Sequence, residues 1–120
     1  MTDQEIRKAL ADHQSKVLES VQKINIAESQ IENLQRVITY SELTADDLKS
    51  LPADVNVYES VGRMFYLQPV EEIQRMLVDK KTNAATKIET LQANKVRLEK
   101  GMKDSGEHFR ELLEQKKSQM

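Results

Sequence analysis

The stretch that decides the fold reads Val55-Asn56-Val57-Tyr58-Glu59-Ser60-Val61-Gly62-Arg63-Met64-Phe65-Tyr66-Leu67. It concentrates valine and aromatic residues around one glycine, whereas Lys, Glu, Gln, Leu and Ala dominate the sequence on either side. β-Branched and aromatic residues favour strands, and a lone glycine between two such runs favours a turn. The sequence therefore predicts a β-hairpin over residues 55–68 that turns near Gly62.

Side-chain alternation along these strands predicts apolar residues on both faces of the hairpin. In the first strand Val57 faces away from Tyr58, and in the second Met64 faces away from Phe65. An isolated two-stranded hairpin cannot bury both faces or pair both edges. We therefore expect hairpins of several subunits to join into a shared sheet or barrel. The residues expected to form this assembly surface are Val55, Val57, Tyr58, Val61, Gly62, Met64, Phe65, Tyr66 and Leu67.

Before the hairpin, apolar residues recur at the heptad spacing of a coiled coil, without interruption by Gly or Pro. Ser20 is a polar position in this seam with Val21 beside it, and His13 reads as a tolerated polar break. The pattern predicts a helix over about residues 3–40. The seam positions are Ile6, Leu10, His13, Val17, Ser20, Ile24, Ala27, Ile31, Leu34 and Ile38.

A second heptad seam follows Pro69, a residue that is well tolerated in the first turn of a helix. Lys81 and Lys95 are its charged positions, and Val96 adjoins the latter. Gly101 and Gly106 each cost about 1 kcal/mol relative to Ala in a helix, so we expect reduced rigidity there. The predicted helix covers residues 69–118, with seam positions Leu77, Lys81, Ala84, Ile88, Leu91, Lys95, Leu98, Met102, Ser105, Phe109 and Leu112.

Between the first helix and the hairpin, residues 41–54 depart from the expected helical pattern. Thr44-Ala45-Asp46-Asp47 has the form of a helix N-cap, and Pro52 follows, so a separate short helix is expected inside this connector. The connection is long enough for the chain to reverse direction. The predicted fold is therefore mainly α: a long antiparallel coiled-coil helical hairpin with one β-hairpin between the helices, in a single domain over residues 1–120.

The hairpin between two heptad arms resembles one known family. Tyr58-Glu59-Ser60-Val61-Gly62 is similar to the hairpin of β-type prefoldin subunits, and Val61-Gly62-Arg63-Met64-Phe65 strengthens the likeness. The resemblance covers nearly the whole chain. It implies a prefoldin-like hetero-hexamer of two α-type and four β-type subunits, in which the hairpins build a β-barrel platform.

The same resemblance implies a chaperone in which the distal tips of the coiled coils bind clients. These would be unfolded proteins such as actin and tubulin, delivered to the cytosolic group II chaperonin without ATP hydrolysis. In an antiparallel helical hairpin both termini lie at the tip, and Met120 would also lie there. The client-binding residues expected at the tip are Ile6, Ala9, Leu10, Phe109, Leu112 and Leu113.

Composition argues against several other functions. The net charge is −2 with both signs interspersed, and the chain contains two His and no Cys. We expect no catalytic, cofactor or metal site, no nucleic-acid or membrane binding, and a cytoplasmic protein without a signal peptide. The alternative function is a structural coiled-coil adaptor or tether, for which a two-faced apolar hairpin has no use. An RNA-binding helical arm would need a basic stripe that the mixed charges do not form.

Overall fold

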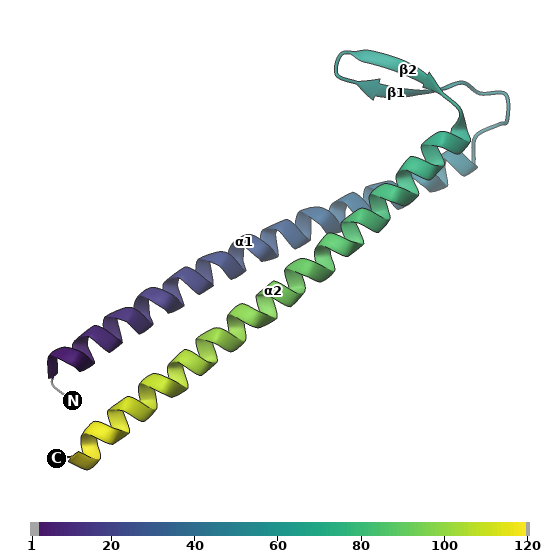
Figure 1. Ribbon diagram of the computed structural model, residues 1–120. Coiled ribbons are helices and arrows are strands. Elements are labelled where there is room, and N and C mark those ends of the chain that lie inside the picture. Colours follow the sequence, from purple (N-terminus) through teal and green to yellow (C-terminus); the bar gives the residue numbers. More distant parts are fainter. Residues whose placement is uncertain (1–2, 120) are drawn as a thin grey trace. The chain divides into compact units, whose positions relative to one another are not determined.

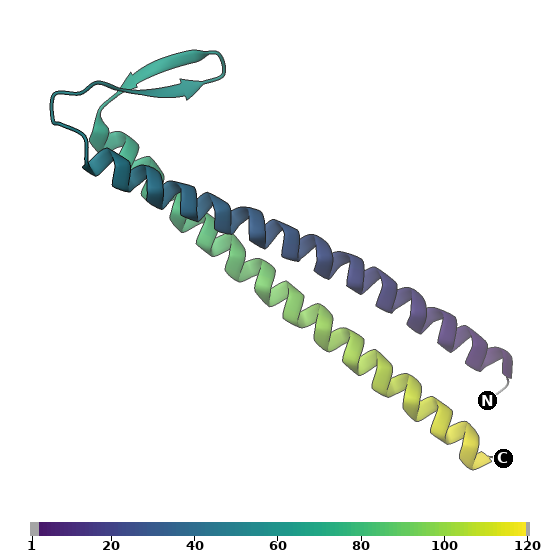
Figure 2. The same ribbon diagram turned by 180° about the vertical axis from the view of Figure 1, so that it is seen from behind.

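The computed structural model describes residues 3–119. Helix α1 (Asp3–Lys49) is followed by strands β1 (Val57–Val61) and β2 (Met64–Gln68) and by helix α2 (Val70–Gln119) (Figure 1). The strands form a two-stranded antiparallel sheet, also visible from behind in Figure 2. The predicted fold class, two long helices with one β-hairpin between them, is confirmed.

Helix α1 is longer than the sequence predicted. It runs without a break to Lys49, so the expected end near residue 40 and the separate short helix are both wrong. The heptad seam in fact continues through Ser41, Ala45 and Leu48, and Ser41 and Leu48 are buried. Packing against α2 therefore overrides the cap-like signal at Thr44, because a continuous helix buries more of the seam than an interrupted one.

Local hydrogen bonds mark the ends of the helices near the hairpin. The amides of Ser50 and Leu51 bond to carbonyls three residues back, at 3.2 and 3.3 Å, which is the tight last turn common at a helix end. At the start of α2 the carbonyl of Pro69 accepts bonds from the amides of Glu72 and Ile73, at 3.1 and 3.2 Å. Helix α2 therefore begins at Val70, one residue after the predicted start at Pro69.

Internal contacts divide the chain into two compact units. The first unit joins the chain up to Gln30 with the chain from Thr90 onward. Here Glu28 of α1 contacts Lys95 of α2 and Asp3 contacts Lys116, so the helices run in opposite directions. Ser20, Ile24 and Ala27 are its buried seam residues.

The seam of the first unit keeps strict heptad spacing even through its polar positions. Ser20 is buried while Val21 is exposed, and Lys95 is half-buried while Val96 is 63% exposed. Neither valine replaces its polar neighbour, because neighbouring residues on a helix point about 100° apart. The seam therefore contains a serine and a lysine rather than two valines.

The second unit covers Ile31–Glu89 and contains the hairpin. Its helical part packs through small residues: Ala84 is 3% exposed and Ser41 is 5% exposed. Lys81 of α2 pairs with Glu42 of α1 at 2.8 Å beside this seam. The buried seam residues Ala84 and Ser41 both have small side chains.

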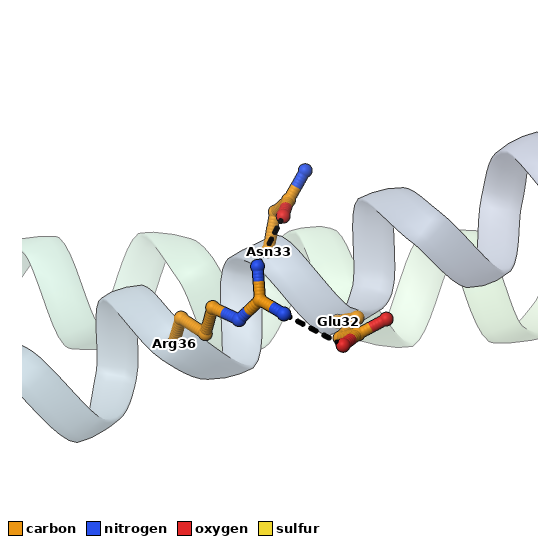
Figure 3. Close-up of polar contacts among 3 residues, drawn as sticks. All are labelled: Glu32, Asn33 and Arg36. Atoms are coloured by element: carbon orange, nitrogen blue, oxygen red, sulfur yellow. Dashed lines mark hydrogen bonds and ion pairs between the residues drawn. The ribbon is translucent and has the colours of Figure 1, made fainter.

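The outer helix surfaces carry charged pairs one turn apart. Arg36 donates to the carboxylate of Glu32 at 2.8 Å and lies within 3.4 Å of the Asn33 amide oxygen (Figure 3). Lys23 pairs with Glu19 at 2.8 Å, and its hydrogen bond and charge lower the pKa of that carboxyl. Exposed pairs at this spacing contribute little to the stability of a helix.

Candidate functional site

The hairpin turns through two residues, Gly62 and Arg63, between the paired residues Val61 and Met64. Gly62 has a φ of 61°, while Arg63 is not among the residues with positive φ. Glycine with positive φ at the first turn position is the signature of a type II′ turn, whose twist suits a two-residue hairpin. The predicted turn near Gly62 is therefore where the sequence placed it.

The pairing register divides the hairpin into two faces, since directly paired residues point to the same side of an antiparallel sheet. We call one the Met64 face and the other the Phe65 face. The hydrogen bond from Gln68 Nε2 to Glu59 Oε2, 3.0 Å, lies on the Met64 face. The Met64 face consists of Val57, Glu59, Val61, Met64, Tyr66 and Gln68, and the Phe65 face of Tyr58, Ser60, Phe65 and Leu67.

Both faces leave large apolar side chains in solvent. Phe65 is 75% exposed on one face, and Met64 is 69% exposed on the other. Val57 is half-buried, and Val55 lies before β1 with its side chain exposed. The other exposed members of the predicted assembly set are Tyr58, Val61, Tyr66 and Leu67. Contiguous exposed apolar surface of this kind typically marks an interaction site, and the assembly role of these residues stays a prediction.

A groove of about 500 Å³ adjoins strand β1 in the second unit. Val57 and Tyr58 contribute its strand side. Leu48 of α1 and Ile73, Met76 and Leu77 of α2 contribute apolar side chains from the helices. The groove extends the exposed apolar surface from the hairpin onto the adjoining turns of both helices.

The predicted tip residues lie in the first unit, where the two ends of the described chain meet. Lys116 of α2 pairs with Asp3 of α1 across this end. Leu10 and Leu113 expose 39% and 37% of their surface. The half-buried members of the predicted set are Ile6, Ala9, Phe109 and Leu112. Met120 lies outside the described residues, and the client-binding role of the whole set remains a prediction.

His13 forms an ordered polar layer that the sequence did not predict. Its Nδ1 lies 2.9 Å from the hydroxyl of Ser105, and its ring stacks on Phe109 with centroids 5.5 Å apart and planes 4° from parallel. Ala9 and Leu112 join these rings around a hollow of about 220 Å³. The available signal was that His13 and Ser105 both occupy seam positions, but only the register between the helices brings them together.

Neither a metal-binding group nor a membrane span occurs among the described residues. Within residues 3–119, no three His, Cys, Asp or Glu side chains are grouped so as to hold a metal ion. Over the same residues, neither helix has a stretch apolar and long enough to cross a lipid bilayer. The hairpin and the tip expose apolar and aromatic side chains.

Comparison with known proteins gives a consistent family. Residues 11–116 match the family described as prefoldin subunit. Prefoldin subunit 1 of Danio rerio and that of Homo sapiens are each 38% identical over 117 residues, covering 98% of this chain and 96% of the relative. Prefoldin subunit 1 of Arabidopsis thaliana is 30% identical and covers 96% of this chain and 90% of the relative.

A solved structure has the same fold. The crystal structure of the prefoldin beta subunit from Thermococcus strain KS-1 matches with a TM-score of 0.73, covering 91% of this chain and 92% of that chain. The two sequences are only 19% identical, so this likeness bears on the fold alone. It agrees with the single hairpin between two helices that the sequence predicted.

Proposed function

Since this chain belongs to the prefoldin family, whose members are chaperone subunits that assemble with one another, we propose that it is a β-type subunit of a hetero-hexamer of two α-type and four β-type subunits. In this proposal the hairpin mediates assembly. The tip of the helical pair binds unfolded proteins such as actin and tubulin. The complex acts in the cytoplasm and delivers its clients to the group II chaperonin without ATP hydrolysis.

The observation that carries the assembly role is the exposure of large apolar side chains on both faces of one small sheet. Phe65 and Tyr66 are neighbours in β2 and point to opposite sides, and 75% and 60% of their surfaces are exposed. A single partner surface can cover one face but not both. An arrangement of several hairpins can pair the open strand edges, enclose one face inside a barrel and place the other face against a neighbouring subunit.

The client role rests on the kind of surface at the end of the first unit. Leu10 and Leu113 are exposed, and Ile6 and Phe109 are only half-buried, so apolar surface is available from both helices. Unfolded proteins expose apolar side chains without a fixed geometry, and a surface that binds them gains most from adaptable apolar contacts. The tip fits this requirement better than the charged outer faces of the helices.

The test separates the two roles. The full chain is mixed with candidate α-type and β-type subunits, and the masses of the complexes are measured by native mass spectrometry. Aggregation of chemically unfolded actin is then followed by light scattering in the absence of ATP. We expect a hexamer that suppresses aggregation. A stable homodimer that is indifferent to partners and inert toward unfolded actin would instead support the adaptor function.

Truncation locates the client surface. Removal of residues 1–10 and 107–120 is expected to abolish suppression of aggregation while the hexamer still forms, because the deleted segments do not include the hairpin. The same measurements on the intact chain are the control. Suppression that survives the truncation at full strength would show that clients bind elsewhere.

A further inference from the structure

Three ion pairs that join the helices within residues 3–119 follow one pattern. Lys81 Nζ lies 2.8 Å from Glu42, Lys95 Nζ lies 3.1 Å from Glu28, and Lys116 pairs with Asp3. In each pair α2 supplies the lysine and α1 supplies the carboxylate. The three lysines also share a single heptad position, separated by two and three heptads along α2.

Lysine is a poor residue for a seam position, because a buried ammonium loses hydration. Lys95 and Lys116 nevertheless have side chains only 31% and 22% exposed. Each lies at the edge of the seam, where its stem covers apolar neighbours and its head reaches an acid of the facing helix. The desolvation cost of these lysines is therefore offset only where the alignment of the two helices places an acidic side chain of α1 beside each lysine.

The apolar pattern alone does not select that alignment. Sliding α1 by one heptad along α2 keeps apolar positions facing apolar positions, since the seam repeats every seven residues. The slide does change what faces the lysines. After a slide of seven residues, the places now taken by Asp3, Glu28 and Glu42 would be taken by their neighbours seven positions away. These neighbours are Leu10, Val21, Gln35 and Lys49, and none of them is acidic.

The His13 layer shows the same dependence on alignment. In the observed alignment His13 hydrogen-bonds to Ser105. Seven residues to either side of Ser105 stand Leu98 and Leu112, which offer no hydrogen bond. A one-heptad slide in either direction therefore removes this bond as well as the interhelical ion pairs described above.

We propose that Lys81, Lys95 and Lys116 are the register key of the helical pair: they select the observed alignment of α1 and α2 over alignments shifted by a heptad. Individually, exposed ion pairs contribute little to stability. Their effect on register is larger, because every shifted alignment loses all of them together and leaves the lysines facing residues that are not acidic. Polar seam residues are known to set register in coiled coils in this way, at some cost in stability.

The register of the two helices also determines how the tip is built. A one-heptad slide displaces one helix by about 10 Å relative to the other. Leu10 and Leu113 would then be displaced relative to each other along the helix axis, and the Asp3–Lys116 contact would be lost. Correct register is thus what brings apolar side chains of both helices to the same end of the first unit.

Electron spin resonance distance measurement on the full chain tests the proposal. The sequence has no cysteine, so Gln22→Cys and Glu111→Cys introduce two unique labelling sites. Both sites are exposed, and they lie on opposite sides of the His13–Ser105 layer, so a slide changes their separation. We expect one distance in the otherwise unchanged chain. In Lys81→Met/Lys95→Met/Lys116→Met we expect additional distances displaced by about 10 Å.

Two controls make the result decisive. Lys87→Gln/Lys100→Gln/Lys103→Gln removes three exposed charges of α2 outside the seam, and we expect the single distance to persist. Reversing all three pairs, in the variant Asp3→Lys/Glu28→Lys/Glu42→Lys/Lys81→Glu/Lys95→Glu/Lys116→Glu, should also keep it. A single unchanged distance in the methionine variant would overturn the proposal. Loss of that distance in the reversed variant, with helicity intact, would overturn it too.

Discussion

The β-hairpin and the seam of the helical pair differ in how far their apolar side chains are exposed to solvent. In the hairpin Phe65 is 75% exposed, whereas in the seam of the second unit Ala84 is 3% exposed. The hairpin carries Tyr58, Phe65 and Tyr66, three of the five aromatic side chains of the protein. The seam of the helices buries its residues within the chain, Ile24 and Leu48 among them, and the hairpin holds large residues that the chain itself does not cover.

The contrast shows which region requires a partner. The seam of the helices is packed by residues of the chain itself, so we expect it to stay folded without partners. A two-stranded sheet with apolar residues on both faces has no such completion. Substitutions in the hairpin should therefore act on assembly, and substitutions in the seam should act on the stability of the folded chain.

The largest expected effect comes from truncating one aromatic on each hairpin face. Phe65→Ser and Tyr66→Ser should each weaken assembly with partner subunits by about 30-fold or more, since central aromatic residues of interfaces typically contribute at least about 2 kcal/mol. Titration followed by native mass spectrometry measures the effect, and far-ultraviolet circular dichroism should show unchanged helicity.

Ser60→Ala is the matched control, because Ser60 pairs with Phe65 on the same face but is small. It should leave assembly within a few-fold of the original. Full-strength assembly of the Phe65→Ser variant would mean that the Phe65 face is not covered in the complex, and the contrast between the two regions would then rest on the Met64 face alone.

A seam substitution should act on folding instead. Ile24 is buried in the first unit, and Ile24→Ala should lower the free energy of unfolding by about 2 kcal/mol, the low end for such truncations because a two-helix seam can partly collapse. Ile26→Ala is the control, with a side chain 57% exposed only two residues along, and should change little. Urea unfolding followed by circular dichroism compares them. Equal effects at the two positions would refute the assigned seam.

The same glycine substitution should have opposite signs in the two regions. Gly62→Ala places a Cβ on a residue with a φ of 61° and should destabilise the hairpin by about 1–2 kcal/mol, although nothing lies within 4 Å of the new atom. Gly101→Ala also meets open space, but in a regular helix, and should stabilise it by about 1 kcal/mol.

Hydrogen exchange of the β1–β2 amides measures the first change, and urea unfolding of the helices measures the second. Stabilisation by Gly62→Ala would contradict the assigned turn. Destabilisation by Gly101→Ala would show that the glycine serves a local bend that the regular helix does not reveal.

The smallest effect is expected on the outer helix surface. Arg36→Gln removes the exposed pair with Glu32 and should cost about 0.3–0.5 kcal/mol. Because salt screens such pairs, the cost should shrink further at high ionic strength. Urea unfolding at low and high salt checks both statements. A loss above about 1 kcal/mol would mean that Arg36 has a role beyond this pair.

The sequence predicted the elements well because their signals are local. The valine and aromatic run around Gly62 and the heptads on either side each depend on a few neighbouring residues, and the structure shows a hairpin and two helices there. The end of the first helix was misplaced by nine residues, at Lys49 instead of 40. There a local cap-like pattern competed with a seam that extends through Leu48, and the longer-range packing was decisive.

The details of the seam needed information that one helix does not contain. Heptad spacing marked Ser20 and Lys95 as exceptions, each with a valine beside it. In the structure the two polar residues nevertheless occupy the seam, while Val21 and Val96 are exposed. Which residue faces His13 depends on how the two helices are aligned. That alignment brings together residues more than ninety positions apart, and no local pattern specifies it.

The successive layers of the first unit also determine how it opens. Each layer, such as Asp3–Lys116 or His13–Ser105, joins residues that face one another, and the backbone hydrogen bonds of a helix reach only four residues away. The two helices of the first unit can therefore separate from the chain ends inward, one layer at a time, while the next layer stays intact. Local opening free energies should rise from Asp3 toward Ile24, which gives amide protons a graded rather than all-or-none exchange along the helix.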